Sequence, residues 1–146
     1  MIGPMIDVTA EIDIAASPAA IAAVMFDPHR YAEWMKAVTS VEVHDAALAP
    51  GARVTHHGAF MGQALTWTTE VTAVHFPHVL ALRITDGPFV GTVRYGIQRS
   101  GDGSRAQIQN TGELKSLGFL PPAMVTGPMK SALQADLERL KALVEA

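Results

Sequence analysis

The first part of the chain alternates between apolar and polar residues. From Ile6 to Ile14 every second residue is Ile, Val or Ala, and the residues between them are acidic or Thr. A period of two is typical of a β-strand with one buried face. Ser17-Pro18 then predicts a helix start, because Ser caps a first turn and Pro at its first position lacks only an N–H that would be unpaired. We expect this helix to end near Asp27-Pro28 and a short helical turn to follow over residues 29–37.

A series of strand patterns comes next, separated by turn-prone pairs such as Pro50-Gly51 and Gly101-Asp102. Short connections between successive strands indicate an antiparallel meander. Glycines occur inside several of these strands, where they often mark the bends that a curled sheet requires. The predicted ranges are 41–44, 52–60, 65–74, 79–85, 89–98 and 105–114.

The last segment is helical in pattern. Apolar residues recur at spacings of three and four, which places them on one face of an amphipathic helix over residues 122–145; they are Met129, Leu133, Leu137, Leu140 and Val144. Gly127-Pro128 interrupts the run and predicts a kink or a fresh helix start. The order of elements therefore predicts an α+β fold, with a sheet curled around the last helix and an apolar space between them.

Composition narrows the classes of function. A length of 146 residues fits one domain with a sizeable core, and the net charge of −3 without a basic cluster argues against nucleic-acid binding. The chain has no Cys, which excludes disulfides, thiolate nucleophiles and Cys-based zinc sites. We find no signal-peptide pattern and no apolar run long enough for a membrane span, so we expect a cytoplasmic protein.

The histidine pairs do not predict a metal site. His56 and His57 are adjacent in a predicted strand, so their side chains point to opposite faces. His75 and His78 flank a predicted exposed turn at Phe76-Pro77. We therefore expect no bound metal, and no motif indicates a cofactor.

The order of elements and several short segments resemble the START-like (SRPBCC) superfamily of helix-grip proteins, and within it the polyketide cyclase/dehydrase group. The segments are Ile12 to Pro18 leading into Ile21 and Val24, Phe26-Asp27-Pro28 through Trp34, Pro50 to Val54, Trp67 to Val74 with Phe76-Pro77 and Leu80, and Leu137 to Lys141. The resemblance runs over nearly the whole chain. It implies one START-like ligand-binding domain over residues 1–146, with a curved antiparallel sheet of about six or seven strands, two short helices after strand 1 and a cavity under the C-terminal helix.

Alternation within the strands predicts which side chains face that cavity. His56, Tyr95 and Asn110 share faces with apolar neighbours, and we expect them to be the polar groups of an otherwise apolar pocket. The predicted apolar walls are Trp34, Phe60, Trp67, Phe119, Met124 and Met129. Residues 116–124 form either a lid over the cavity mouth or a plain packed connection.

Three functions fit this pattern. The first is the binding of a small hydrophobic or aromatic molecule, lipid-like or polyketide-like. The second is cyclisation or dehydration of a carbonyl substrate, with His56 moving protons and Tyr95 donating a hydrogen bond to an enolate oxygen. Both residues also fit a structural role, satisfied by backbone or water, or simple anchoring of a ligand, and we favour these roles over catalysis. The third is a protein-interaction module with a filled core, and the sequence identifies neither the ligand, a protein partner nor the oligomeric state.

Overall fold

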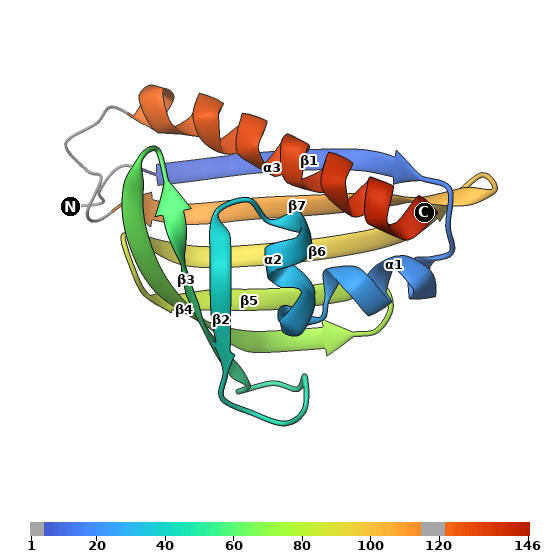
Figure 1. The fold of residues 1–146 in the computed structure, drawn as a ribbon, viewed down its shortest axis with the longest axis horizontal. Helices are drawn as coiled ribbons and strands as arrows, with labels where there is room; N and C mark the ends of the chain where they lie inside the picture. The colour runs from blue at the N-terminus through green and yellow to red at the C-terminus, as the bar shows by residue number, and fades with distance from the viewer. Residues whose placement is uncertain (1–4, 115–121) are drawn as a thin grey trace.

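Figure 1 shows a seven-stranded sheet that curves around one long helix. The computed structural model describes residues 5–114 and 122–146. The sheet order is β1-β7-β6-β5-β4-β3-β2, and every neighbouring pair is antiparallel. The strands are β1 (Met5–Ile14), β2 (Val38–Val43), β3 (Arg53–Phe60), β4 (Gln63–His75), β5 (Val79–Asp86), β6 (Phe89–Ser100) and β7 (Gly103–Leu114). The predicted helix-grip architecture is confirmed.

The helices begin where the sequence predicts. In α1 (Pro18–Met25) the hydroxyl of Ser17 accepts a hydrogen bond from the N–H of Ala20 at 3.2 Å. A 3₁₀ turn, η1 (Pro28–Arg30), and the short α2 (Tyr31–Trp34) follow. These elements connect β1 to β2, which lie at opposite edges of the sheet, so the connection has to cross the concave face (Figure 1).

The long helix α3 (Pro122–Glu145) packs over the β1 side of the sheet. Its polar side chains bond to the outer backbone edge of β1 and to the residue that follows the strand. Gln134 Nε2 donates to the carbonyl of Glu11 at 3.1 Å, and Lys141 Nζ donates to the carbonyl of Asp13 at 3.1 Å. The N–H of Ala15 donates to the Glu145 carboxylate at 2.8 Å. The helix thus covers an edge strand whose backbone groups would otherwise be open to another chain.

The helix does not start afresh at Gly127-Pro128. It runs without a break from Pro122 to Glu145, with Pro128 inside it. Proline removes one backbone hydrogen bond, but the apolar face continues on both sides of it. Val125 is fully buried before the proline, and Leu137 is fully buried after it. Packing against the sheet therefore holds both parts in one helix.

Two clusters of buried side chains lie beneath α3. The larger one gathers α1, α2 and the middle strands around Leu137 and Leu140 of the helix. The smaller one joins Val125 of α3 to Ile6 and Val8 of β1. Within residues 5–114 and 122–146, no helix is long and apolar enough to cross a membrane.

One glycine marks a close approach of two backbones. Gly58 of β3 pairs with Val38, next to the point where the β2–β3 register shifts. A Cβ atom at Gly58 would lie 1.5 Å from the carbonyl oxygen of Ala37 and 2.6 Å from its carbonyl carbon. That carbonyl also accepts the N–H of Ala59 at 2.9 Å, so it has no freedom to move away. Only glycine fits here.

We expect Gly58→Ala to lower the free energy of unfolding by about 1–3 kcal/mol, because the added methyl group overpacks against a fixed backbone. Gly96→Ala is the matched control. It lies in β6, where a new Cβ meets nothing within 4 Å, and we expect it to be neutral or slightly stabilising. Urea unfolding of both variants checks the prediction, and equal stability of the two would contradict it.

Candidate functional site

A cavity of about 190 Å³ lies between α3 and the concave face of the sheet. It is situated where the two buried clusters meet, since residues from both clusters line it. The helix α3, the strands β3 to β7, and the segment from α2 into β2 all contribute walls. The lining residues are Trp34, Met35, Ala37, Val38, Phe60, Leu65, Trp67, Ile84, Pro88, Phe89, Val93, Tyr95, Ile108, Asn110, Val125, Met129, Ala132, Leu133 and Asp136.

Most of the residues predicted from the sequence meet at this cavity. Their backbones come from α2, four strands and α3, so only the folded chain brings them together. Those that line it are Trp34, Phe60, Trp67, Tyr95, Asn110 and Met129. His56 and Met124 are not among the described lining residues, and Phe119 lies outside the described residues, as does most of the predicted lid over 116–124.

Met124 is 55% exposed, so its predicted place in the cavity wall is not supported. The next residue, Val125, is fully buried and takes that place. The reason is helical geometry: each residue turns the side chain by about 100°. A loop prediction for residue 124 does not include this rotation, so it does not separate Met124 from Val125.

Trp34 is held in place from several directions. Its side chain is fully buried, and its ring meets those of Tyr31 and Tyr95 edge-on, with centroid distances of 6.2 Å in both cases. Its carbonyl accepts a hydrogen bond from Arg139 Nε of α3 at 3.0 Å. Aromatic edge contacts and a backbone bond together fix the orientation of the indole.

Asp136 of α3 lines the cavity, and the sequence interpretation missed it. Its carboxylate accepts the N–H of Lys36 at 3.1 Å and pairs with Arg139, while the residue is only 6% exposed. Burial raises the pKa of this carboxyl, opposed by the hydrogen bond from Lys36 and by the charge of Arg139. The sequence spacing could have indicated its burial. Residue 136 lies three positions after Leu133 and four before Leu140, which places it on the apolar face of the helix.

Tyr95 contributes a phenol to the same wall and is 4% exposed. Burial raises its pKa well above the usual value, and the neighbouring Tyr31 and Asp136 add to that effect. Tyr95 is therefore a neutral phenol.

Two polar atoms at the cavity differ from these because they are buried without a partner in the described part of the chain. They are the indole nitrogen Nε1 of Trp34 and the amide oxygen Oδ1 of Asn110. The Asn110 amide nitrogen makes a long contact to the sulfur of Met129, at 3.9 Å. Buried polar groups normally find partners, so each of these atoms requires an explanation.

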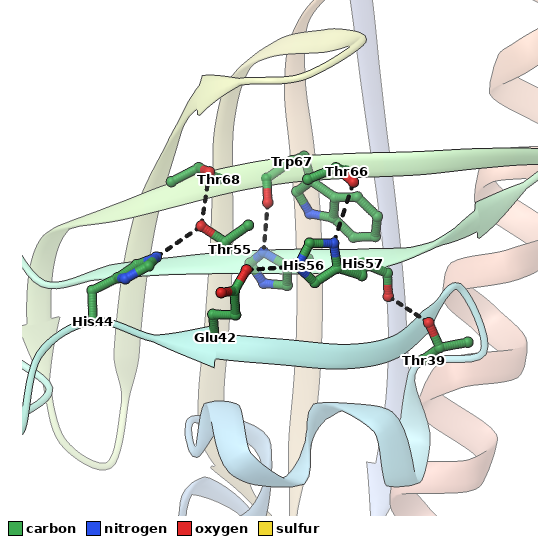
Figure 2. Close-up of polar contacts among 9 residues, drawn as sticks. All are labelled: Thr39, Glu42, His44, Thr55, His56, His57, Thr66, Trp67 and Thr68. Carbon is green, nitrogen blue, oxygen red and sulfur yellow. Dashed lines mark hydrogen bonds and ion pairs between the residues drawn. The ribbon is translucent and has the colours of Figure 1, made fainter.

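His56 is buried, as predicted, but it is enclosed by aromatic rings instead of facing the cavity. Its ring stacks on Trp67 at 5.0 Å with an interplanar angle of 2°, and on Tyr31 at 5.7 Å with an angle of 9°. Its Nδ1 lies 3.2 Å from the carbonyl oxygen of Trp67 (Figure 2). Trp67 lines the cavity, and Tyr31 belongs to α2. Alternation within the strand predicts that His56 points inward, but it does not predict that a side chain of α2 covers the imidazole.

The neighbouring His57 points to the other face of the sheet, as Figure 2 shows. Its Nε2 lies 2.7 Å from the Glu42 carboxylate, and its Nδ1 lies 3.3 Å from the hydroxyl of Thr66. These groups are largely exposed, so the pair contributes little to stability. In the described ranges, no group of three or more His, Asp or Glu side chains is arranged to hold a metal ion.

The environment of His56 predicts a pH dependence. Burial lowers its pKa from 6.5 to about 4, so the folded protein keeps the imidazole neutral while the unfolded chain becomes protonated below pH 6.5. The contribution of the neutral His56 to the free energy of unfolding is fully present above pH 6.5 and is lost as the pH falls toward 4. Between pH 7 and pH 5 the loss amounts to about 2 kcal/mol.

We expect His56→Phe to remove this part of the decline in unfolding free energy between pH 7 and pH 5, whatever its stability at pH 7. His75→Gln removes an exposed imidazole and is the control that keeps the decline. Urea unfolding at both pH values measures it. A decline in His56→Phe as steep as in the unmodified protein would refute the assignment.

Comparisons with known proteins agree with this architecture. Among solved structures, a protein from Thermus thermophilus is 22% identical, covers 96% of this chain and 97% of its own, and has a TM-score of 0.82. A START superfamily protein from Mycobacterium smegmatis is 21% identical, with 98% of each chain covered and a TM-score of 0.79. The Zhui aromatase/cyclase from Streptomyces sp. R1128 is 19% identical, with coverage of 97% and 94% and a TM-score of 0.76.

At these identities the solved structures establish the fold alone. A search of the curated proteins finds no match. The family model described as polyketide cyclase/dehydrase and lipid transport matches residues 5–145, which is nearly the whole chain. The chain therefore belongs to the polyketide cyclase/dehydrase and lipid transport family.

Proposed function

We propose that this protein binds a small hydrophobic, aromatic molecule in the cavity beneath α3. The observation that carries the proposal is the cavity itself, which is lined by apolar and aromatic side chains from helices and strands and has few polar groups. Ligand pockets in proteins have this composition, with a small number of polar groups that orient the ligand. The family to which the chain belongs includes proteins of lipid transport, which supports a binding role.

The volume of the cavity favours a compact ligand. An apolar cavity of about 150 Å³ in another protein accepts benzene, and the cavity here is about 190 Å³. A molecule of one or two fused rings matches this space. The aromatic walls formed by Trp34, Phe60 and Trp67 also suit a flat ring, because aromatic rings gain from stacked and edge contacts.

Cyclisation or dehydration of a carbonyl substrate is the second candidate, and the family description favours it. The pairing of His56 with Tyr95 receives little support from the geometry. The imidazole is enclosed by Tyr31 and Trp67 and is absent from the described cavity lining. A proton-transfer residue has to reach the substrate within hydrogen-bonding distance, so we rank binding first.

The third hypothesis, an interaction module, required a filled core. A cavity of about 190 Å³ between the sheet and α3 does not meet that condition. We therefore place the function in the interior of the molecule.

Filling the cavity tests the proposal. Ala132 lines it from α3, and Ala135 lies on the exposed face of the same helix. We expect naphthalene to bind the unmodified protein with a dissociation constant on the order of 0.1 mM. Ala132→Phe should weaken binding at least about tenfold because the new ring occupies the space, and Ala135→Phe should leave it unchanged. Ligand-detected NMR measures the affinities, and native mass spectrometry identifies any molecule that copurifies.

The proposal would be overturned if naphthalene failed to bind the unmodified protein and no small molecule copurified with it. Equal binding by Ala132→Phe and Ala135→Phe, with both variants folded by circular dichroism, would place the ligand somewhere other than this cavity.

A further inference from the structure

The outer face of β2, β3 and β4 carries three polar side chains in a row. Thr66 of β4, His57 of β3 and Glu42 of β2 come from neighbouring strands and are joined by hydrogen bonds (Figure 2). His57 Nδ1 lies 3.3 Å from the Thr66 hydroxyl, and His57 Nε2 lies 2.7 Å from the Glu42 carboxylate. A hydroxyl, an imidazole and a carboxylate in this order are the components of an activated nucleophile.

The hydrogen bonds determine which nitrogen of the imidazole carries the proton. The hydrogen bond from His57 lowers the pKa of the Glu42 carboxyl, so this group is an anion near neutral pH and only accepts. In the neutral imidazole the hydrogen is therefore on Nε2, and the lone pair of Nδ1 accepts the O–H of Thr66. This is the tautomer that takes a proton from the hydroxyl.

The three side chains are held by the sheet and are open to solvent. His57 pairs with Thr66 in the β3–β4 register, and the Thr39 hydroxyl donates to the His57 carbonyl at 2.8 Å. The side chains of His57 and Glu42 are 40% and 60% exposed, and Thr66 is exposed too. A small molecule therefore reaches the Thr66 hydroxyl without entering the cavity.

We propose that Thr66, His57 and Glu42 form a second site, which hydrolyses small aryl esters through an acyl-enzyme. The Thr66 oxygen attacks the carbonyl carbon of the ester, and its proton passes to His57 Nδ1. The bond to the aryloxide then breaks, and the leaving oxygen takes that proton. Water attacks the acyl group next, His57 takes a proton from the water and returns one to the Thr66 oxygen, and the carboxylic acid leaves.

The surroundings define the substrate class and the role of each residue. On an open face, solvent water stabilises the oxyanion, so the substrate needs a leaving group as good as a phenol. Thr66 and His57 are the catalytic residues because they exchange atoms or protons with the substrate. Glu42 is a positioning residue, which holds the imidazole in the required tautomer.

A second hydroxyl–imidazole pair on the same face supplies the matched control. His44 Nε2 lies 2.8 Å from the hydroxyl of Thr55, as Figure 2 shows. In the described ranges the His44 ring has no hydrogen bond to a carboxylate. His44 thus offers an exposed imidazole beside a threonine without the third component.

The first test is turnover of p-nitrophenyl acetate, followed by the release of p-nitrophenolate. We expect a burst of product followed by a slower steady rate, since the acyl-enzyme forms before it is hydrolysed. His57→Gln and Thr66→Val should each lower the protein-dependent rate at least about tenfold. Thr66→Ser should retain it because the hydroxyl remains, and His44→Gln should leave it unchanged.

The second test locates the nucleophile and the role of Glu42. Diethyl p-nitrophenyl phosphate should phosphorylate the Thr66 oxygen, located by fragmentation mass spectrometry, and the labelled fraction should fall at least about tenfold in His57→Gln. Glu42→Leu should lower turnover and shift His57 from the Nε2–H toward the Nδ1–H tautomer, measured by ¹⁵N NMR at pH 8.5. A purely structural role of Glu42 would leave the tautomer as it is.

Three results would each overturn this inference: no turnover above that of the buffer, equal rates in His57→Gln and His44→Gln, or labelling at a residue other than Thr66. The proposed function is tested separately, because naphthalene binds in the cavity on the opposite side of the sheet and should not inhibit the hydrolysis. Failure of the ester site therefore leaves the binding proposal standing, and failure of naphthalene binding leaves the ester site standing.

Discussion

The structure depends on how α3 is seated against the sheet. The helix is anchored near its C-terminus, where Leu137 and Leu140 are fully buried and Lys141 and Glu145 bond to the β1 edge and the residue beyond it. At its other end Val125 is buried against β1. Between these contacts Met129, Ala132 and Leu133 line the cavity. The way α3 is seated over the curved sheet therefore sets the space that the cavity occupies.

A second constraint joins the helices to one another. Arg139 and Asp136 of α3 bond to the backbone at Trp34 and Lys36, which lie at the end of α2 and just after it. Because a buried charge is costly unless it is paired and hydrogen-bonded, this contact has little freedom to vary. It fixes where α2 meets α3, and with it the position of the Trp34 indole at the cavity wall.

The sequence predicts the order of elements well because alternation and helical spacing report burial along one element. It places Phe60, Trp67 and Tyr95 on the correct face for the same reason. It does not show that Tyr31 of α2 stacks on His56 of β3. That contact depends on how separate elements pack together. Nor does a residue type reveal that the Trp34 indole nitrogen has no partner among the residues that the structure describes. Such facts belong to tertiary packing. Packing also outweighs the local effect of proline at Gly127-Pro128, where the helix runs on and the fresh start, one of the two expected alternatives, does not occur.

The chain has two tryptophans, and both of them line the cavity. All of the intrinsic tryptophan fluorescence of this protein therefore originates at one place, with no contribution from a distant surface or a second core. Any molecule that enters changes the surroundings of both emitters at once. Tryptophan fluorescence therefore reports directly on whether the cavity is occupied. Extracts or compound collections can be screened for a natural ligand with the unlabelled protein.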